Sequence, residues 1–204
     1  MRDIEAIIFD VGEVQVQGLV GVNKHLEPVV GKPIDGKALF ESTALAAYFR
    51  GACDEDELWR EWSKDFGWSA QIDDLKTAVR KNFTEVPGTR RIIELLNARR
   101  YPLGLLSVHG REWVRHIASR FSLHTPFRHV SYSYCGGPSK PDPRAFEACA
   151  EKLRVEPRFC LVIDDYPVNT EAAARAGFQT HLFTDAHRLH NELRTHDVLV
   201  DVAD

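Results

Sequence analysis

A chain of 204 residues is long enough for one substantial hydrophobic core, alone or with a small satellite subdomain. Hydrophobic residues make up 44% of the sequence and charged residues 27%, which is ordinary for a globular protein. The formal net charge of −4 provides no basic stripe, so nucleic acid is not an expected partner. No apolar stretch reaches the length of a membrane span, so we expect no membrane association.

The N-terminal sequence lacks a basic region followed by a long apolar one, and we therefore expect no secretory signal peptide. The four cysteines, Cys53, Cys135, Cys149 and Cys160, are scattered without CxxC spacing. This pattern favours reduced thiols over a zinc site or a disulfide framework. We accordingly expect a cytoplasmic protein, and nothing in the sequence indicates its oligomeric state.

The first predicted element is a short buried strand, Ala6 to Phe9, that runs directly into Asp10. Its continuous apolar residues are typical of a parallel strand that is buried on both faces. Gly12, two positions after the aspartate, indicates a tight turn. In open α/β sheets, ligands bind at the carboxyl ends of the strands. Asp10 is therefore either a carboxylate delivered to a binding site or simply the start of a turn.

The sequence from residue 16 to residue 86 is rich in helix formers and aromatic residues. Four helices are predicted there, over residues 20–30, 37–50, 55–66 and 71–83. Asp54, with Glu57 three positions later, forms a capping-box pattern at the start of the third helix. We predict a small helical cap subdomain over 16–86, inserted into a core domain that comprises 1–15 and 87–204.

Helices and strands alternate from Pro87 onward. Helices are predicted over residues 89–100, 111–121, 143–153, 170–176 and 187–194, and strands over 103–106, 130–134, 160–163 and 179–183. Strands separated by helices require crossover connections, which are right-handed and make the strands parallel. The predicted fold class is therefore α/β, a doubly wound, mainly parallel sheet with the helical cap inserted after its first strand.

Polar residues follow several of these strands, at the ends that a parallel sheet brings to one edge. They are Asp10, Ser107, Lys140 and the pair Asp164 and Asp165. Three carboxylates at one edge repel one another unless a cation lies among them, and oxygen ligands without His or Cys suit Mg²⁺. A lysine and a hydroxyl group beside them form an anion site. Together these groups are the components of phosphoryl transfer through an aspartyl phosphate.

Each of these residues also has a simpler interpretation when it is taken alone. Ser107 could cap the end of a strand, and Lys140 could be a solvated loop lysine. The pair Asp164 and Asp165 could mark only a turn and the start of a helix. Their joint occurrence, in this order and at strand ends, favours the site.

Four sequence motifs resemble those of the haloacid dehalogenase-like hydrolase superfamily, whose members are mostly Mg²⁺-dependent phosphatases. In chain order they are IIFDVGEV, LLSVHG, SKPDPRAF and LVIDDYPVNTEAAARAG. The resemblance extends from Asp10 to Gly177, and the last two motifs are highly specific. It is greatest for the phosphatase branch that contains the glucose-1-phosphate phosphatase type and the N-terminal domain of soluble epoxide hydrolase. Members of this family carry a helical cap between the first two motifs.

The resemblance implies a metal site and a nucleophile. Asp10 is expected to attack phosphorus and to bind Mg²⁺, and the backbone carbonyl of Gly12 is expected to be a second ligand. Asp165 is expected to bind the metal directly, and Asp164 to bind it or to orient one of its waters. Asn169 matches a position that orients the neighbouring groups.

The resemblance also implies a phosphate site. Ser107 and the backbone amide of Val108 are expected to hold phosphate oxygens. Lys140 is expected to neutralise both the phosphate and the Asp10 carboxylate. The implied substrate is a small phosphorylated metabolite.

Position 12 departs from the usual family pattern. Most phosphatases of the superfamily have an aspartate two residues after the nucleophile, which protonates the leaving oxygen and then activates water. Here that residue is Gly12, although some relatives in the same branch also carry glycine. Loss of such a group costs on the order of 10²–10⁴ in rate. Glu13 is adjacent but should point elsewhere after a tight turn, and His109 is either a substrate contact or a partly buried loop histidine.

Three functions are consistent with these residues. The first is a Mg²⁺-dependent phosphatase, a phosphoric monoester hydrolase, that works through an aspartyl phosphate on Asp10. The second is a catalytically weak or inactive relative that binds a phosphorylated ligand or a protein partner. A 2-haloacid dehalogenase ranks below both, because that branch needs no metal, whereas this chain keeps the acidic pair and Lys140.

Overall fold

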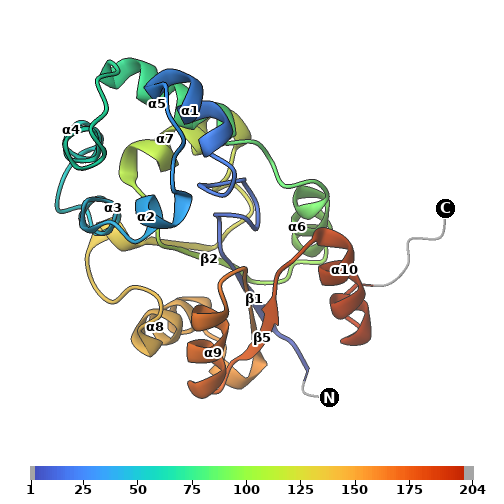
Figure 1. The fold of residues 1–204 in the computed structure, drawn as a ribbon. Coiled ribbons are helices and arrows are strands. Elements are labelled where there is room, and N and C mark those ends of the chain that lie inside the picture. Colours follow the sequence, from blue (N-terminus) through green and yellow to red (C-terminus); the bar gives the residue numbers. More distant parts are fainter. Residues whose placement is uncertain (1–2, 200–204) are drawn as a thin grey trace.

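A sheet of five parallel strands organises the computed structural model, which describes residues 3–199 (Figure 1). The strands are β1 (Ala6–Phe9), β2 (Leu103–Ser107), β3 (His129–Tyr132), β4 (Cys160–Asp164) and β5 (Gln179–Leu182). Their order in the sheet is β3-β2-β1-β4-β5, and every neighbouring pair is parallel. This confirms the predicted fold class.

Helices cover both faces of the sheet, because alternate residues of each strand point to opposite sides. The helices after the cap are α6 (Thr89–Ala98), α7 (Arg111–Phe121), α8 (Pro143–Leu153), α9 (Pro167–Arg175) and α10 (Ala186–Thr195). Ile7 and Phe9 of β1 belong to an apolar cluster with residues of α6 and α10. Ala6 and Ile8 belong to another, with α8 and α9. The unbroken apolar sequence of β1 is thus explained by burial on both faces.

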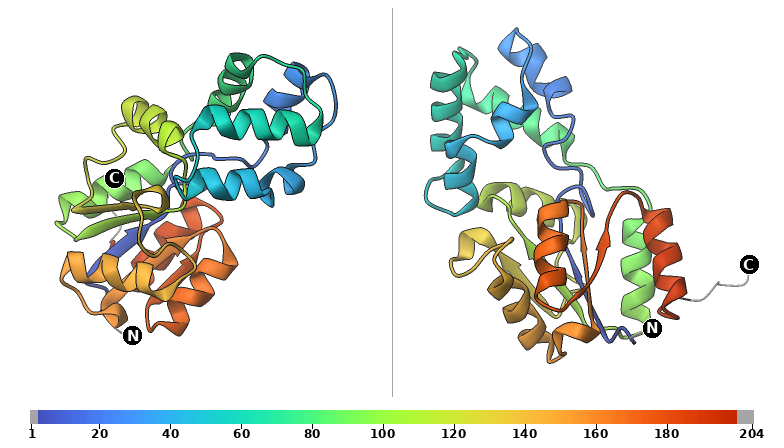
Figure 2. Two further views of the ribbon diagram at one scale, coloured as in Figure 1. Left: turned by 90° about the vertical axis from the view of Figure 1, so that its left-hand side faces the viewer. Right: turned by 60° about the horizontal axis from the view of Figure 1, so that its bottom comes forward.

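Five helices lie between β1 and α6 and form a lobe beside the sheet (Figures 1 and 2). They are α1 (Asn23–Val30), α2 (Gly36–Phe40), α3 (Thr43–Phe49), α4 (Glu55–Phe66) and α5 (Ile72–Asn82). We call this lobe the cap. Its apolar cluster includes Trp59 and Trp62 and continues onto Trp113 of α7 and Leu105 of β2. The cap therefore shares its core with one end of the sheet, and the division at residues 16 and 86 stays a prediction.

Side-chain caps define several helix boundaries. The capping box predicted at Asp54 is present: its Oδ1 accepts a hydrogen bond from the amide of Glu57 at 2.8 Å, and Glu57 Oε2 accepts one from the amide of Asp54 at 2.9 Å. The single helix predicted over 37–50 is wrong. Ser42 Oγ accepts a hydrogen bond from the amide of Leu45 at 3.2 Å and starts α3 anew after α2 has ended at Phe40.

Three other predicted boundaries are displaced. The helix predicted over 20–30 begins at Asn23, because hydrogen bonds to Glu13 and Asn82 hold the backbone of Gly18 and Val20 outside it. The helix predicted from Thr170 begins at Pro167, since proline suits the first helical position. The strand predicted to reach residue 134 ends at residue 132 and continues as a short 3₁₀ turn.

Two further observations concern the cysteines and the lengths of the helices. All four cysteines are free, as their spacing predicts. Among residues 3–199, none of the helices has both the length and the apolar character that crossing a bilayer requires.

A buried carboxylate joins the cap to the sheet-flanking helix α7. Glu55, the first residue of α4, is 3% exposed. Its Oε1 accepts hydrogen bonds from the indole Nε1 of Trp113 at 2.9 Å and of Trp59 at 3.3 Å. Its Oε2 pairs with Nη2 of Arg80, on α5, at 2.5 Å. The burial of this charge is tolerated because both oxygens have polar partners.

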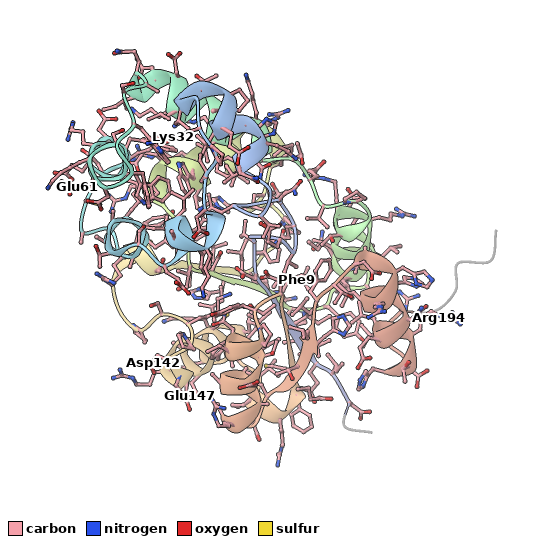
Figure 3. The ribbon with its side chains drawn as sticks, viewed as in Figure 1. Phe9, Lys32, Glu61, Asp142, Glu147 and Arg194 are labelled. Atoms are coloured by element: carbon pink, nitrogen blue, oxygen red, sulfur yellow. The ribbon has the colours of Figure 1, made fainter. Side chains whose placement is uncertain are left out.

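We expect Glu55→Ala to lower the free energy of unfolding by about 3 kcal/mol, because two indole N–H groups and a guanidinium lose their acceptor. Urea denaturation followed by tryptophan fluorescence measures the change. Glu61→Ala is the matched control on α4, where Glu61 faces solvent and lies 3.8 Å from Lys64 (Figure 3). It should change stability by less than about 0.5 kcal/mol. Equal losses in the two variants would contradict the role of Glu55.

Candidate active site

Three carboxylates meet where β1 and β4 end. Asp10 directly follows β1, Asp164 is the last residue of β4, and Asp165 follows it. One oxygen from each carboxylate lies within 4.8 Å of the others. The pairing of the two strands, with Phe9 opposite Ile163, brings them together. We call these three residues the carboxylate cluster.

Lys140 is the counter-charge of the carboxylate cluster. It lies between β3 and α8 and is 6% exposed. Its Nζ lies 2.9 Å from Oδ2 of Asp10 and also forms a hydrogen-bonded ion pair with Oδ2 of Asp164. Burial alone would lower the pKa of Lys140, but Asp10 and Asp164 outweigh it and raise the pKa above its ordinary value. The ammonium group therefore stays charged.

Asp164 is held on its other side by α9. Its Oδ1 accepts hydrogen bonds from the amide of Tyr166 at 3.0 Å and from Nδ2 of Asn169 at 2.9 Å. Burial, followed by the charge of Asp10, raises the pKa of Asp164, and Lys140 opposes this shift. The contact with Asn169 fixes the orientation of the carboxylate.

Unlike Asp164, Asp165 has no ion pair with Lys140 and no hydrogen bond from Asn169 among the described residues. Within residues 3–199, Lys140 forms ion pairs with Asp10 and Asp164, and no cation pairs with Asp165. Burial, together with the charges of Asp10 and Asp164, raises the pKa of Asp165 to about 7. One lysine thus neutralises only part of the charge of three carboxylates. A set of three oxygen donors with excess negative charge fits Mg²⁺.

Ser107 lies at the same edge of the sheet, as the last residue of β2. It is 2% exposed, and its Oγ has no hydrogen-bond partner among the described residues. A buried hydroxyl group without a partner costs about 1–3 kcal/mol, so the arrangement suits a ligand that accepts its hydrogen bond. An anion oxygen held near Lys140 would be such a ligand.

A cavity of about 380 Å³ lies between the carboxylate cluster and the cap. This volume is within the range of small-molecule sites. The sequence-predicted site residues that line it are Asp10, Gly12, Val108, Lys140 and Asp165. Aromatic residues line it as well, namely Phe40, Phe49, Phe83, Trp113 and Tyr166. Asn169 lines it too, whereas Ser107 and Asp164 are not among its lining residues, and the roles of all these residues stay a proposal.

Glu13 lines the cavity, but its carboxylate is engaged with the following loop. Its Oε1 accepts hydrogen bonds from the amides of Gly18 at 2.9 Å and Val20 at 3.0 Å. From the other side, Nδ2 of Asn82 donates to the carbonyls of Gly18 at 2.7 Å and Val20 at 3.0 Å. The pair Glu13 and Asn82 therefore fixes the loop that borders the site. The sequence does not identify Asn82 as a residue near the site, because no local pattern at the end of a helix predicts a hydrogen bond to a residue more than sixty positions away.

His109 is a buried, neutral part of the cavity wall. It is 4% exposed, and the rings of Phe49, Phe83 and Trp113 surround it with centroids at 6.0, 6.2 and 6.0 Å. Burial lowers the pKa of His109 to about 4, so the ring is uncharged near neutral pH. Its Nδ1 accepts a hydrogen bond from the amide of Gly110 at 3.0 Å, which places the ring proton on Nε2.

Without divalent ions, we expect the stability of the protein to fall as the pH rises through neutrality. The pKa of Asp165, about 7 in the folded protein, exceeds its value of about 3.9 in unfolded chains. The folded state therefore binds more protons between these values, so the contribution of Asp165 to stability is fully present below about pH 4 and is lost as the pH rises through about 7. In EDTA at about pH 8, Asp165→Asn should be more stable than wild type by on the order of 1–2 kcal/mol.

Urea denaturation at several pH values measures this difference, which should shrink as the pH is lowered toward about 5. Glu147→Gln, on the exposed face of α8 (Figure 3), is the control and should show no such trend over that range. A difference between Asp165→Asn and wild type that does not depend on pH would contradict the assignment.

Comparison with known proteins shows which chains are similar to this one. A family model described as haloacid dehalogenase-like hydrolase matches residues 4–177. A chloroplast protein of Arabidopsis thaliana named flavin mononucleotide hydrolase 1 is 27% identical over 156 residues, which are 75% of this chain and 62% of that protein. Hexitol phosphatase B of Escherichia coli K12 is 28% identical over 117 residues, 57% of this chain and 51% of that protein. The chain thus spans less than two thirds of the length of these curated relatives.

Solved structures show the same fold. The magnesium complex of a haloacid dehalogenase family enzyme from Bacteroides thetaiotaomicron superposes with a TM-score of 0.77 at 19% identity. The match covers 95% of this chain and 100% of that chain.

Proposed function

The chain belongs to the haloacid dehalogenase-like hydrolase family, and we propose that it hydrolyses a small phosphate monoester with the help of Mg²⁺, with Asp10 as the nucleophile. The observation that carries this proposal is the carboxylate cluster around Lys140 at one end of the cavity. The names of the relatives support it, since one is called a flavin mononucleotide hydrolase and the other a hexitol phosphatase.

In the proposed reaction, a carboxylate oxygen of Asp10 attacks phosphorus, and the bond between phosphorus and the leaving oxygen breaks. An aspartyl phosphate and an alkoxide result, and the alkoxide takes a proton. Water then attacks phosphorus, the bond to Asp10 breaks, and inorganic phosphate is released. Because Gly12 has no side chain, both proton transfers fall to water in the cavity or to another group of the site.

The surrounding residues bind and orient the phosphate. Lys140 balances the charge of Asp10 and of the phosphate, and the Ser107 hydroxyl group and the Val108 amide donate hydrogen bonds to phosphate oxygens. Asn169 holds Asp164 in place.

The residues that would hold Mg²⁺ are Asp10, Asp164, Asp165 and the carbonyl of Gly12. When bound, the metal ion neutralises charge on the phosphoryl oxygens and favours in-line attack.

We expect Asp10→Asn to reduce Mg²⁺-dependent hydrolysis of 4-nitrophenyl phosphate by about 10³-fold or more, because the nucleophile is lost. Asp142→Asn is the matched control. Asp142 caps α8 through its Oδ1, at 3.0 Å from the amide of Arg144, and asparagine also serves as a cap. The control should retain wild-type turnover. Wild-type activity that is independent of Mg²⁺, or equal to that of Asp10→Asn, would contradict the proposal.

Gly12→Asp tests the missing proton carrier directly. A Cβ atom at Gly12 would meet no atom within 4 Å, so the first atom of the new side chain has open space. If a second aspartate supplies general acid–base catalysis, kcat should rise, by about 10²-fold. Gly12→Ala is the control for the added bulk and should bring no increase. A lower kcat in Gly12→Asp would mean that proton transfer already has another route.

The absent side chain at Gly12 favours one alternative, a catalytically weak relative that binds a phosphorylated ligand. This alternative predicts that inorganic phosphate with Mg²⁺ raises the melting temperature of wild type while no phosphate ester is turned over. Dehalogenation of a 2-haloacid is less favoured, because the carboxylate cluster is suited to a metal that such a reaction does not need. It would be detected as chloride release in EDTA.

A further inference from the structure

Two aromatic rings lie exposed at the mouth of the cavity, although large apolar side chains are usually buried. Phe40, the last residue of α2 in the cap, is 55% exposed, and Tyr166, which follows Asp165, is 48% exposed. Both line the cavity. Their ring centroids are 6.4 Å apart and their planes are inclined by 59°. Exposed aromatic groups gathered at a cavity are characteristic of binding sites.

The cap side of the cavity continues this apolar surface inward. Leu19, Leu45, Phe49 and Phe83 line it there, and Arg50 is the one charged residue that the described part of the cap contributes. A flat conjugated ring would replace water on these apolar and aromatic surfaces.

His109 adds one hydrogen-bond donor, its Nε2–H group, to this wall. Its ring stands among Phe49, Phe83 and Trp113, and its Nε2 carries a proton because Nδ1 accepts from Gly110. The charged residues of the cavity that belong to the proposed reaction, Asp10, Lys140 and Asp165, lie in segments that follow strands of the sheet. The cavity is thus polar on the sheet side and aromatic on the cap side.

We propose that the substrate is a phosphate monoester whose leaving group carries a flat aromatic ring system, which packs against Phe40 and Tyr166 at the cavity mouth; we call these two rings the clamp. This assignment rests on the proposed phosphatase function and specifies its substrate class. One ring of the clamp comes from the cap and the other from the sheet domain, so both parts of the chain are needed to recognise the leaving group.

A matched pair of substrates isolates the ring. Flavin mononucleotide and ribitol 5-phosphate carry the same phosphorylated polyol chain, and only the former has a flat ring system. With Mg²⁺ present, we expect kcat/KM of wild type to be higher for flavin mononucleotide by about tenfold or more, as stacking of one ring on aromatic side chains implies.

Substitutions at the clamp test where this preference arises. Phe40→Leu and Tyr166→Leu keep an apolar side chain but remove the flat ring, and each should reduce the preference by about tenfold. Tyr166→Phe keeps the ring and should retain the preference. Tyr101→Leu is the control for loss of an aromatic ring, since Tyr101 precedes β2 at the opposite end of the sheet and packs against another apolar cluster. It should retain the preference as well.

Binding of riboflavin separates this inference from the phosphatase proposal. Riboflavin has the ring but no phosphate, and stacking on Phe40 and Tyr166 should quench its fluorescence in wild type and less in the two leucine variants. Equal kcat/KM for the two esters, or a preference that both leucine variants retain, overturns the ring assignment and leaves the phosphatase proposal standing. If neither ester is hydrolysed, the phosphatase proposal fails for both. Quenching that depends on Phe40 and Tyr166 then still supports the clamp, and its absence overturns it.

Discussion

The repulsion among three carboxylates is the constraint on which the candidate site depends. Because β1 and β4 pair in parallel, the residues at their ends lie side by side at one edge of the sheet. One carboxylate oxygen each of Asp10, Asp164 and Asp165 therefore lies within 4.8 Å of the others. Lys140, buried beside them, pairs with two of these carboxylates but supplies only one positive charge. The remaining negative charge favours a cation, and a cation beside a lysine favours an anionic ligand. The fold therefore creates the electrostatic need that the proposed chemistry meets.

The polar and apolar ends of the cavity follow from different parts of the chain. Groups suited to phosphate lie at strand ends or in the segments that follow them. The hydrogen bonds between the strands hold these ends in fixed positions. The groups that face a leaving group lie largely on cap helices and their loops. Glu13 and Asn82 stiffen the loop that joins these two regions, by satisfying both the amides and the carbonyls of Gly18 and Val20. Chemistry and selectivity can thus change separately in this architecture.

Much of the fold could be predicted because β1, β2 and β4 are unbroken apolar runs that end in polar residues. The rule that parallel strands share an edge then brings Asp10, Ser107 and Asp164 together without knowledge of distances, and the family match confirms the resemblance carried by the motifs. Contacts between distant segments escaped prediction. The hydrogen bonds of Glu55 and the tilted contact between the rings of Phe40 and Tyr166 join residues with no periodic relation in the sequence. The break at Ser42 was missed because helix formers continue on both sides of it.

The hydrogen bonds of Glu55 bear on how a ligand can reach the cavity. Because the Glu55 carboxylate ties α4 and α5 of the cap to α7 through buried hydrogen bonds, swinging the whole cap away from the sheet would expose a charge and two indoles at once. Opening of the whole cap would therefore break the hydrogen bonds of Glu55, whereas a local movement at the cavity mouth would leave them intact. For the phosphatase proposed above, this difference favours small substrates over a phosphorylated side chain on the surface of a folded protein.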